Sequence, residues 1–197
     1  PVCSLGGKIL RNILLVGVGG QGILLASEIL SEAFMLAGFD VKKSEIHGMS
    51  QRGGSVVSHV RYGKEVHSPI VPEGEGDILF GFELMETYRY LSMLRKGGTV
   101  VANDLRISPP SVLLGQASYP DDLPDRIRAL FPDFLLVDGQ HLAAEAGNVR
   151  AANTVLLGAV AKRLDIPDEC WQKAIERMVP SKALDVNRKA FQLGRAL

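Results

Sequence analysis

One short stretch, residues 13–25, limits most strongly what this chain can fold into. An uncharged apolar run at residues 13–16 enters a glycine-rich turn at residues 17–22, and apolar residues then recur at helical spacing. A strand that leads through a tight turn into a helix is the first half of a β-α-β unit. The stretch therefore predicts an α/β protein built on a largely parallel sheet.

The turn has the spacing G-x-G-x-x-G at Gly17, Gly19 and Gly22. The first glycine permits the tight turn, the second lets a ligand approach the backbone, and the third lets helix and strand pack closely. Free N–H groups at the helix N-terminus favour an anion here. Together with Gly20 and Gln21, these glycines form a candidate phosphate cradle. The same spacing also suits a close helix–strand crossing that binds no ligand, and both interpretations stay open.

A dinucleotide site would need an acidic residue about 20 residues further on, at the end of the second strand. Glu45 lies at about that distance, but Lys42 and Lys43 stand just before it. The fingerprint is therefore incomplete. A free-standing NAD(P)-binding oxidoreductase is one alternative function, and a non-enzymatic binding module with a purely structural glycine turn is another.

Composition narrows the class of protein. The 22 basic and 22 acidic residues give a net charge of zero, so nothing indicates a nucleic-acid partner. The uncharged stretch around the glycine turn is too short for a membrane span, and no apolar signal region precedes it, so we expect a cytoplasmic protein. The two cysteines cannot supply the four thiolates of an iron–sulfur cluster, and the histidines lack zinc spacing, so no metal site is predicted.

Strand and helix patterns alternate along the rest of the chain. Strands are expected at residues 8–16, 39–46, 77–82, 99–102 and 134–137. Helices are expected at residues 21–37, 84–95, 122–131, 141–147 and 153–163, then from Pro167 and at 181–193. Alternation at residues 55–62, followed by a Gly-Lys turn, predicts a hairpin with residues 65–68.

We therefore predict one domain over residues 1–197, with its core at about 8–178 and a helical extension at 179–197. The expected fold is α/β: a Rossmann-like, mainly parallel sheet with helices on both faces, a β-hairpin insertion and a helical C-terminal tail.

A second glycine-rich loop, His-Gly-Met-Ser-Gln-Arg-Gly-Gly at residues 47–54, lacks apolar periodicity and should face a ligand or a partner. Arg52 offers a planar guanidinium suited to a carboxylate or phosphate, with a structural ion pair as the alternative. His47 could move protons near neutral pH, but a hydrogen-bonding anchor is the favoured role. Ser50 and Gln51 are either ligand contacts or turn caps.

The two loops together resemble the gamma subunit or gamma domain of 2-oxoacid:ferredoxin oxidoreductases, and the second loop is most similar to the indolepyruvate branch. The stretch that begins at Asn153 is similar to a late helix of that family, which opens with asparagine. The resemblance extends from Lys8 to about Met178.

The resemblance implies one subunit of an enzyme that oxidatively decarboxylates a 2-oxoacid to an acyl-CoA. Thiamine diphosphate, iron–sulfur clusters and coenzyme A are expected in the assembled enzyme, and none of these cofactors on this chain alone. A large partner subunit would carry the thiamine and the clusters and would pass electrons to ferredoxin. We expect a hetero-oligomer, with a homodimer as the alternative for the isolated chain. The particular 2-oxoacid and the catalytic residues are not specified.

The resemblance also places the second loop and the start of the late helix near the active region or the partner contact. The residues concerned are His47, Gly48, Ser50, Gln51, Arg52, Gly53, Gly54 and Asn153.

Overall fold

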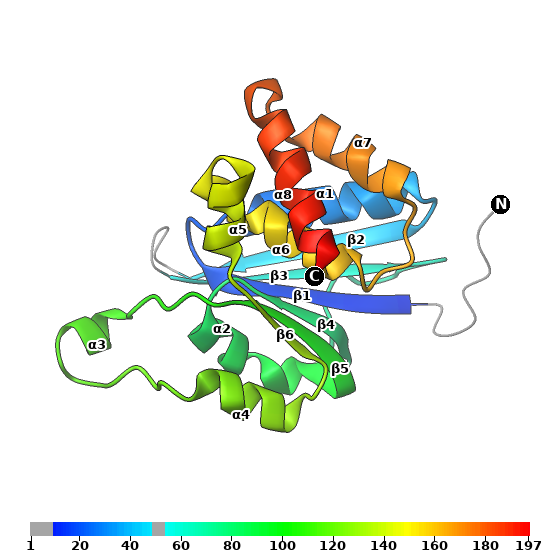
Figure 1. The fold of residues 1–197 in the computed structure, drawn as a ribbon. Helices are drawn as coiled ribbons and strands as arrows, with labels where there is room; N and C mark the ends of the chain where they lie inside the picture. Colours follow the sequence, from blue (N-terminus) through cyan, green and yellow to red (C-terminus); the bar gives the residue numbers. More distant parts are fainter. Residues whose placement is uncertain (1–9, 49–53) are drawn as a thin grey trace.

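A six-stranded sheet forms the centre of the computed structural model, which describes residues 10–48 and 54–197 (Figure 1). Its strands are β1 (Leu10–Val18), β2 (Asp40–His47), β3 (Ser55–Gly63), β4 (Gly76–Gly81), β5 (Leu94–Asn103) and β6 (Phe134–Val137). The order across the sheet is β2-β3-β1-β4-β5-β6. The four neighbouring strands β1, β4, β5 and β6 are parallel to one another. Strand β3 is antiparallel to both of its neighbours, β1 and β2. The predicted mainly parallel sheet is confirmed.

Helices cover both faces of this sheet (Figure 1). They are α1 (Ile23–Leu36), α2 (Leu84–Arg89), α3 (Pro110–Leu113), α4 (Leu123–Leu130), α5 (Gly139–Ala146), α6 (Ala152–Ala161), α7 (Asp168–Met178) and α8 (Leu184–Ala196), with short 3-10 turns at η1 (Leu91–Met93), η2 (Val149–Ala151) and η3 (Ser181–Ala183). Helices α1 and α5–α8 lie on one face, and α2 and α4 lie on the other. In the part of the chain that the structure describes, no helix has the length and apolar character needed to cross a membrane.

The apolar run in β1 divides its side chains between the two faces. Ile13 and Leu15 belong to the core under α1 and α6, whereas Leu14 and Val16 belong to the core under α2 and α4. All four side chains are completely buried. Successive residues of a strand point to opposite faces, so a strand covered on both sides needs an unbroken apolar run.

The antiparallel hairpin consists of β2 and β3, and the return strand expected at residues 65–68 does not form. Strand β3 pairs with β1 along one edge and with β2 along the other. Because both edges of β3 are occupied, residues 65–68 have no strand partner there. A hydrogen bond from the Val66 N–H to the Asp40 carboxylate (2.8 Å) holds this segment instead.

The helix expected at residues 84–95 is also shorter than predicted. It ends at Arg89 and is followed by a 3-10 turn, and β5 begins at Leu94. The pairing of β5 with β4 is irregular near its start, and Gly97 lies there with φ +70°. The Gly-Gly pair at residues 97–98 therefore lies inside β5, at the irregularity in its pairing with β4.

The last helix, expected as an extension, packs directly onto α6. Phe191 of α8 is completely buried, and glycines stand where the two backbones meet. A Cβ atom at Gly158 would overlap the carbonyl oxygen of Phe191, and one at Gly194 would overlap the carbonyl oxygen of Val155. The helices can approach this closely only because neither position carries a side chain.

We therefore expect Gly194→Ala to destabilise the protein by about 3 kcal/mol or more, since the clash is with backbone that cannot rotate away. For a chain of this size that loss lowers the melting temperature by roughly 6–12 °C. The direction of this change in stability is informative, because replacing glycine by alanine within a helix normally stabilises a protein. Gln192→Ala, at an exposed position of the same helix, is the control. An unchanged melting temperature for Gly194→Ala would show that the helices do not cross as described.

Candidate functional site

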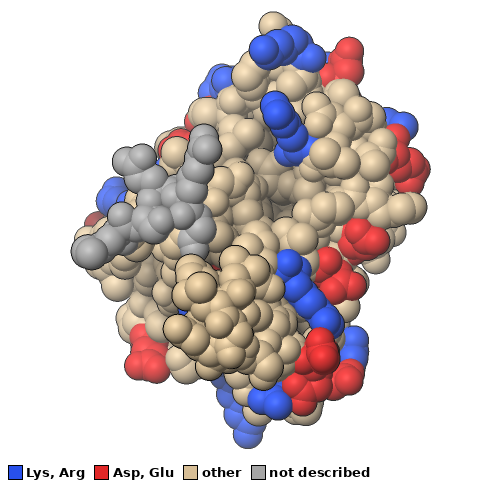
Figure 2. Space-filling model, turned by 90° about the vertical axis from the view of Figure 1, so that its left-hand side faces the viewer, with Lys and Arg blue, Asp and Glu red and all other residues tan. Residues whose placement is uncertain are grey.

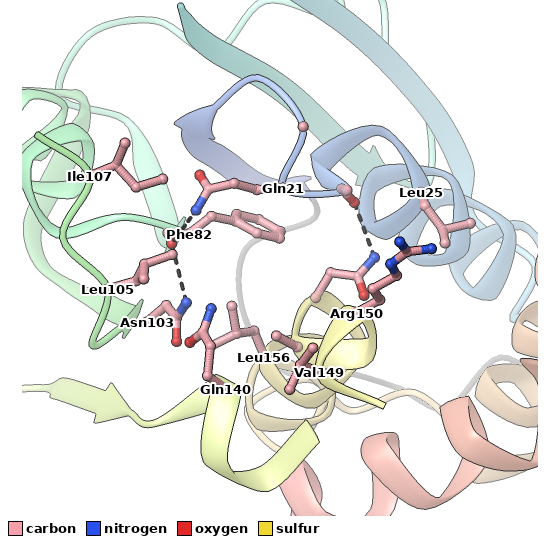
Figure 3. A pocket seen from close by; sticks show the side chains of 14 residues that line it. Gln21, Leu25, Phe82, Asn103, Leu105, Ile107, Gln140, Val149, Arg150 and Leu156 are labelled. Carbon is pink, nitrogen blue, oxygen red and sulfur yellow. Dashed lines mark hydrogen bonds between the residues drawn. The ribbon is translucent and has the colours of Figure 1, made fainter. Parts of the chain in front are cut away.

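The carboxyl ends of β1, β4 and β5 open into a crevice of about 490 Å³ (Figure 3). The chain leaves β1 toward α1 on one face and leaves β4 toward α2 on the other, so the crevice lies at the switch point where α/β folds bind ligands. Figure 2, which faces this edge, shows a hollowed surface surrounded mostly by uncharged residues. The lining residues are Gly20, Gln21, Gly22, Leu25, Phe82, Asn103, Leu105, Ile107, Gln140, Val149, Arg150, Ala152, Asn153 and Leu156.

The glycine turn forms one wall of the crevice, and its glycines have different roles. A Cβ atom at Gly17 would lie 2.6 Å from Gln21 Oε1 and 2.8 Å from Phe82 Cβ. Gly22 has φ +78°, and a Cβ atom there would lie 2.6 Å from Asn153 Nδ2. Packing within the chain thus explains the first and third glycines. Gly20 has φ +100° and open space around its Cβ position, so it leaves the wall accessible to a ligand.

Gln21 lines the crevice, and its side-chain amide closes the turn. Its Oε1 accepts a hydrogen bond from the Val18 N–H (2.6 Å), and its Nε2 donates to the Phe82 carbonyl (2.9 Å). Asn103 donates to the same carbonyl (3.3 Å) and accepts from the Gly139 N–H (3.1 Å). Two amides therefore join the ends of β1, β4 and β5 to the start of α5 (Figure 3).

Asn153 fixes the start of α6 against the glycine turn. It is buried, and its Nδ2 donates to the Gly22 carbonyl (3.3 Å), while its Oδ1 accepts from the Thr154 N–H (2.9 Å). The structure thus brings together two candidate residues that lie 131 positions apart in the sequence.

The second loop approaches the same turn through its last residue. The Gly19 N–H donates to the Gly54 carbonyl (2.9 Å), and the Gly48 N–H donates to the Ser55 carbonyl (3.0 Å). His47 is exposed, pairs with Glu45 (2.6 Å) and does not line the crevice, and its anchoring role remains a prediction. The other predicted residues of this loop lie outside the described residues, and their roles remain predictions: Ser50, Gln51, Arg52 and Gly53.

Two further polar residues of the crevice were not anticipated from the sequence. Arg150 is the only charged residue in the lining, and it has no ion-pair partner among the described residues. The Gln140 Oε1 is buried and lacks a hydrogen-bond partner in the same part of the chain. Both residues lie at or just before helix starts, where no periodic pattern marks a site. An anionic ligand would meet a guanidinium and no carboxylate in this crevice.

The arrangement of the strands does not support a dinucleotide site. In such a site the acidic residue follows a strand adjacent to the glycine-turn strand. Here β3 separates β2 from β1, so Glu45 lies about two strand spacings, roughly 10 Å, from β1. Lys42 and Lys43 are paired with Asp40 and Glu28. These lysines are therefore held by the protein's own carboxylates.

The described residues also do not fit a metal or an iron–sulfur cluster. Within residues 10–48 and 54–197 no group of three or more His, Cys, Asp or Glu side chains is placed to hold a metal ion. Cys170 is buried, and burial raises the pKa of its thiol. A neutral, buried thiol is a poor cluster ligand.

The fold and the crevice define a class of protein, an α/β domain with an anion-compatible site at its switch point, and comparison with known proteins identifies the family. A family model described as pyruvate ferredoxin/flavodoxin oxidoreductase matches residues 12–197. The chain belongs to this family.

Individual relatives agree with this assignment. The chain is 45% identical to indolepyruvate oxidoreductase subunit IorB from Pyrococcus horikoshii and 43% identical to the subunit of that name from Thermococcus kodakarensis, each over 93% of both chains. The gamma subunit of a keto/oxoacid ferredoxin oxidoreductase from Geobacter sulfurreducens superposes with a TM-score of 0.68 at 25% identity, covering 93% of this chain and 95% of that one. The predicted family, and with it the predicted class of ferredoxin-dependent 2-oxoacid oxidoreductase subunits, is confirmed.

The two hydrogen bonds of the Gln21 side chain, to Val18 and to Phe82, lead to a specific prediction. Gln21→Glu keeps the acceptor for Val18 but places a carboxylate oxygen against the Phe82 carbonyl, so we expect a loss of about 1–3 kcal/mol at pH 7. The repulsion between the carboxylate and the Phe82 carbonyl raises the folded-state pKa of the new carboxyl above its unfolded value of about 4.3. The loss is therefore full above the folded-state pKa and shrinks as the pH falls toward 4, where the protonated acid can donate to Phe82.

Urea denaturation at several pH values measures this loss, with Gln192→Glu as the exposed control. A loss that is the same at pH 4 and pH 7 would contradict the described hydrogen bond.

Proposed function

We propose that this chain is the small, cluster-free subunit of a ferredoxin-dependent oxidoreductase that acts on indolepyruvate or a related arylpyruvate. The reaction of this enzyme is the oxidative decarboxylation of the 2-oxoacid to an acyl-CoA. Two lines of support are the indolepyruvate relatives at 43–45% identity and the second loop at residues 47–54, which has the form of the indolepyruvate branch.

The proposal assigns the redox cofactors to a larger partner subunit. Two cysteines in the whole chain are too few for a four-thiolate cluster, and the described residues offer no metal site. Thiamine diphosphate and the clusters are therefore proposed on the partner, which also meets ferredoxin.

The role proposed for this chain is to hold the anionic part of coenzyme A in the crevice. The observation that carries this role is the convergence of the glycine turn, the start of α6 and the unpaired Arg150 on a cavity without a carboxylate. The first hydrogen bond within α1 runs from the Ala26 N–H to the Gly22 carbonyl, so earlier N–H groups of that helix have no partner within it. These N–H groups and a guanidinium suit a phosphate.

The second loop is proposed to complete the site or to contact the partner. Its last residue, Gly54, is hydrogen-bonded to Gly19 in the glycine turn. Arg52, two residues earlier in the sequence, is the second cation proposed for the carboxylate or phosphate.

We expect the isolated chain to be colourless and inactive, and the complex with the large subunit to reduce ferredoxin or a dye in the presence of a 2-oxoacid and coenzyme A. The reason is that this chain lacks residues for the redox cofactors. Iron analysis and steady-state assays of each subunit and of the mixture check this expectation. Turnover or stoichiometric iron in the isolated chain would contradict the proposal and favour an independent oxidoreductase.

In the assembled enzyme, Arg150→Ala should raise the KM for coenzyme A roughly 10- to 100-fold, the equivalent of one charge-assisted hydrogen bond. The KM for the 2-oxoacid should stay unchanged, because that substrate reacts at the partner's thiamine. Arg126→Ala removes an exposed arginine from α4 and serves as the control. An unchanged KM for coenzyme A would remove Arg150 from the proposed site.

A further inference from the structure

The connection between β5 and α4 extends away from the sheet as an arm that carries α3 near its tip (Figure 1). We call residues 107–118 the α3 arm. Helix α3 contains no buried residue. Because no side chain of α3 is packed into the core, core packing does not explain why this helix is present.

The surface of the α3 arm carries no charged side chain, and two adjacent leucines project from it. Leu113 is 75% exposed and Leu114 is 71% exposed. Between residues 107 and 120 the sequence contains no Asp, Glu, Lys or Arg. Figure 2 shows the corresponding uncharged projection below the hollow. Single exposed apolar residues are common, but adjacent exposed leucines in an uncharged projection are typical of an interaction site.

The base of the arm is fixed to the body by a buried carboxylate. Oε1 of Glu83 accepts hydrogen bonds from the Ile107 N–H (3.1 Å) and from the Tyr119 hydroxyl (2.5 Å), and Glu83 is almost completely buried. The Tyr119 oxygen in turn accepts from the Met85 N–H (3.0 Å). Burial, and then the hydrogen bond to Glu83, raise the pKa of the Tyr119 phenol, which therefore remains a donor at neutral pH. Both ends of the arm are held in place, which reduces the entropy lost on binding.

The arm also lies at the rim of the candidate site. Ile107 lines the crevice and also a second cavity of about 350 Å³ beneath the arm. That cavity is bounded by Pro109, Pro110 and Leu113 on the side of the arm. A protein that covered the arm would therefore also cover the edge of the crevice.

We propose that the α3 arm is the docking element for the larger subunit of the enzyme and inserts Leu113 and Leu114 into an uncharged, apolar groove on that subunit. This inference rests on the proposed function, which makes the chain one part of an assembly. Charged groups on the partner would lose water against the arm without gaining a counter-charge, so the complementary surface must be apolar. Because Ile107 lines the crevice, docking at the arm would also cover the edge of the crevice.

The test compares three variants of this chain with the wild type in their affinity for the immobilised large subunit. The double variant Leu113→Asp/Leu114→Asp should bind about 100-fold more weakly or worse, as expected for central apolar anchors. Leu130→Asp changes a leucine on α4 that is 61% exposed and lies outside the arm, and it should bind within about threefold of the wild type. Leu113→Met/Leu114→Met should retain most of the affinity. Equal melting temperatures establish that the exposed substitutions leave the fold intact.

Wild-type affinity in the aspartate double variant would overturn the docking inference and leave the proposed function standing. Failure of the wild-type chain to bind the large subunit would instead overturn the proposed function, and the inference with it. Sedimentation velocity of the isolated chain distinguishes a third outcome. If the aspartate variant dissociates a homodimer but still binds the large subunit normally, the arm is a contact between copies and the proposal is wrong.

Discussion

The carbonyl group of Phe82 accepts hydrogen bonds from two side-chain amides, and the shape of the crevice depends on this shared acceptor. Gln21 reaches it from the glycine turn and Asn103 reaches it from the end of β5. The ends of three parallel strands are thereby held together without a charged residue. An uncharged framework leaves the positive potential of Arg150 and of the helix N-termini uncompensated, which is what an anionic ligand requires.

The insertion of β3 between β1 and β2 has a second consequence for the site. The insertion keeps the strand–turn–helix unit that holds a phosphate in dinucleotide-binding folds. It also moves β2, and Glu45 with it, away from the position where a dinucleotide's ribose would be bound. The same insertion brings Gly54, at the start of β3, into hydrogen-bonding contact with Gly19. One change of topology thus removes the features of a dinucleotide site and couples the second glycine-rich loop, residues 47–54, to the glycine turn.

Local sequence patterns predicted the elements better than their pairing. The uncharged run of β1 and the helical spacing after Gly22 predicted an α/β fold. The resemblance to the family's late helix placed Asn153 among the site residues. Each of these signals lies within one segment of the sequence, so neither depends on how the strands pair. The return strand at residues 65–68 was wrong because strand pairing depends on which edges are occupied, which no local pattern contains. Arg150 was missed because an exposed arginine in a short 3-10 turn looks like any surface residue until the fold brings it to the crevice.

A structure of the assembled enzyme with coenzyme A, determined by crystallography or electron cryomicroscopy, tests the central claim most directly. We expect a phosphate of coenzyme A within hydrogen-bonding distance of the Arg150 guanidinium and against the backbone of Gly20, with Gln21 still bonded to Val18 and Phe82. Coenzyme A held entirely by the partner subunit, with this crevice empty or filled by a partner side chain, would contradict the claim.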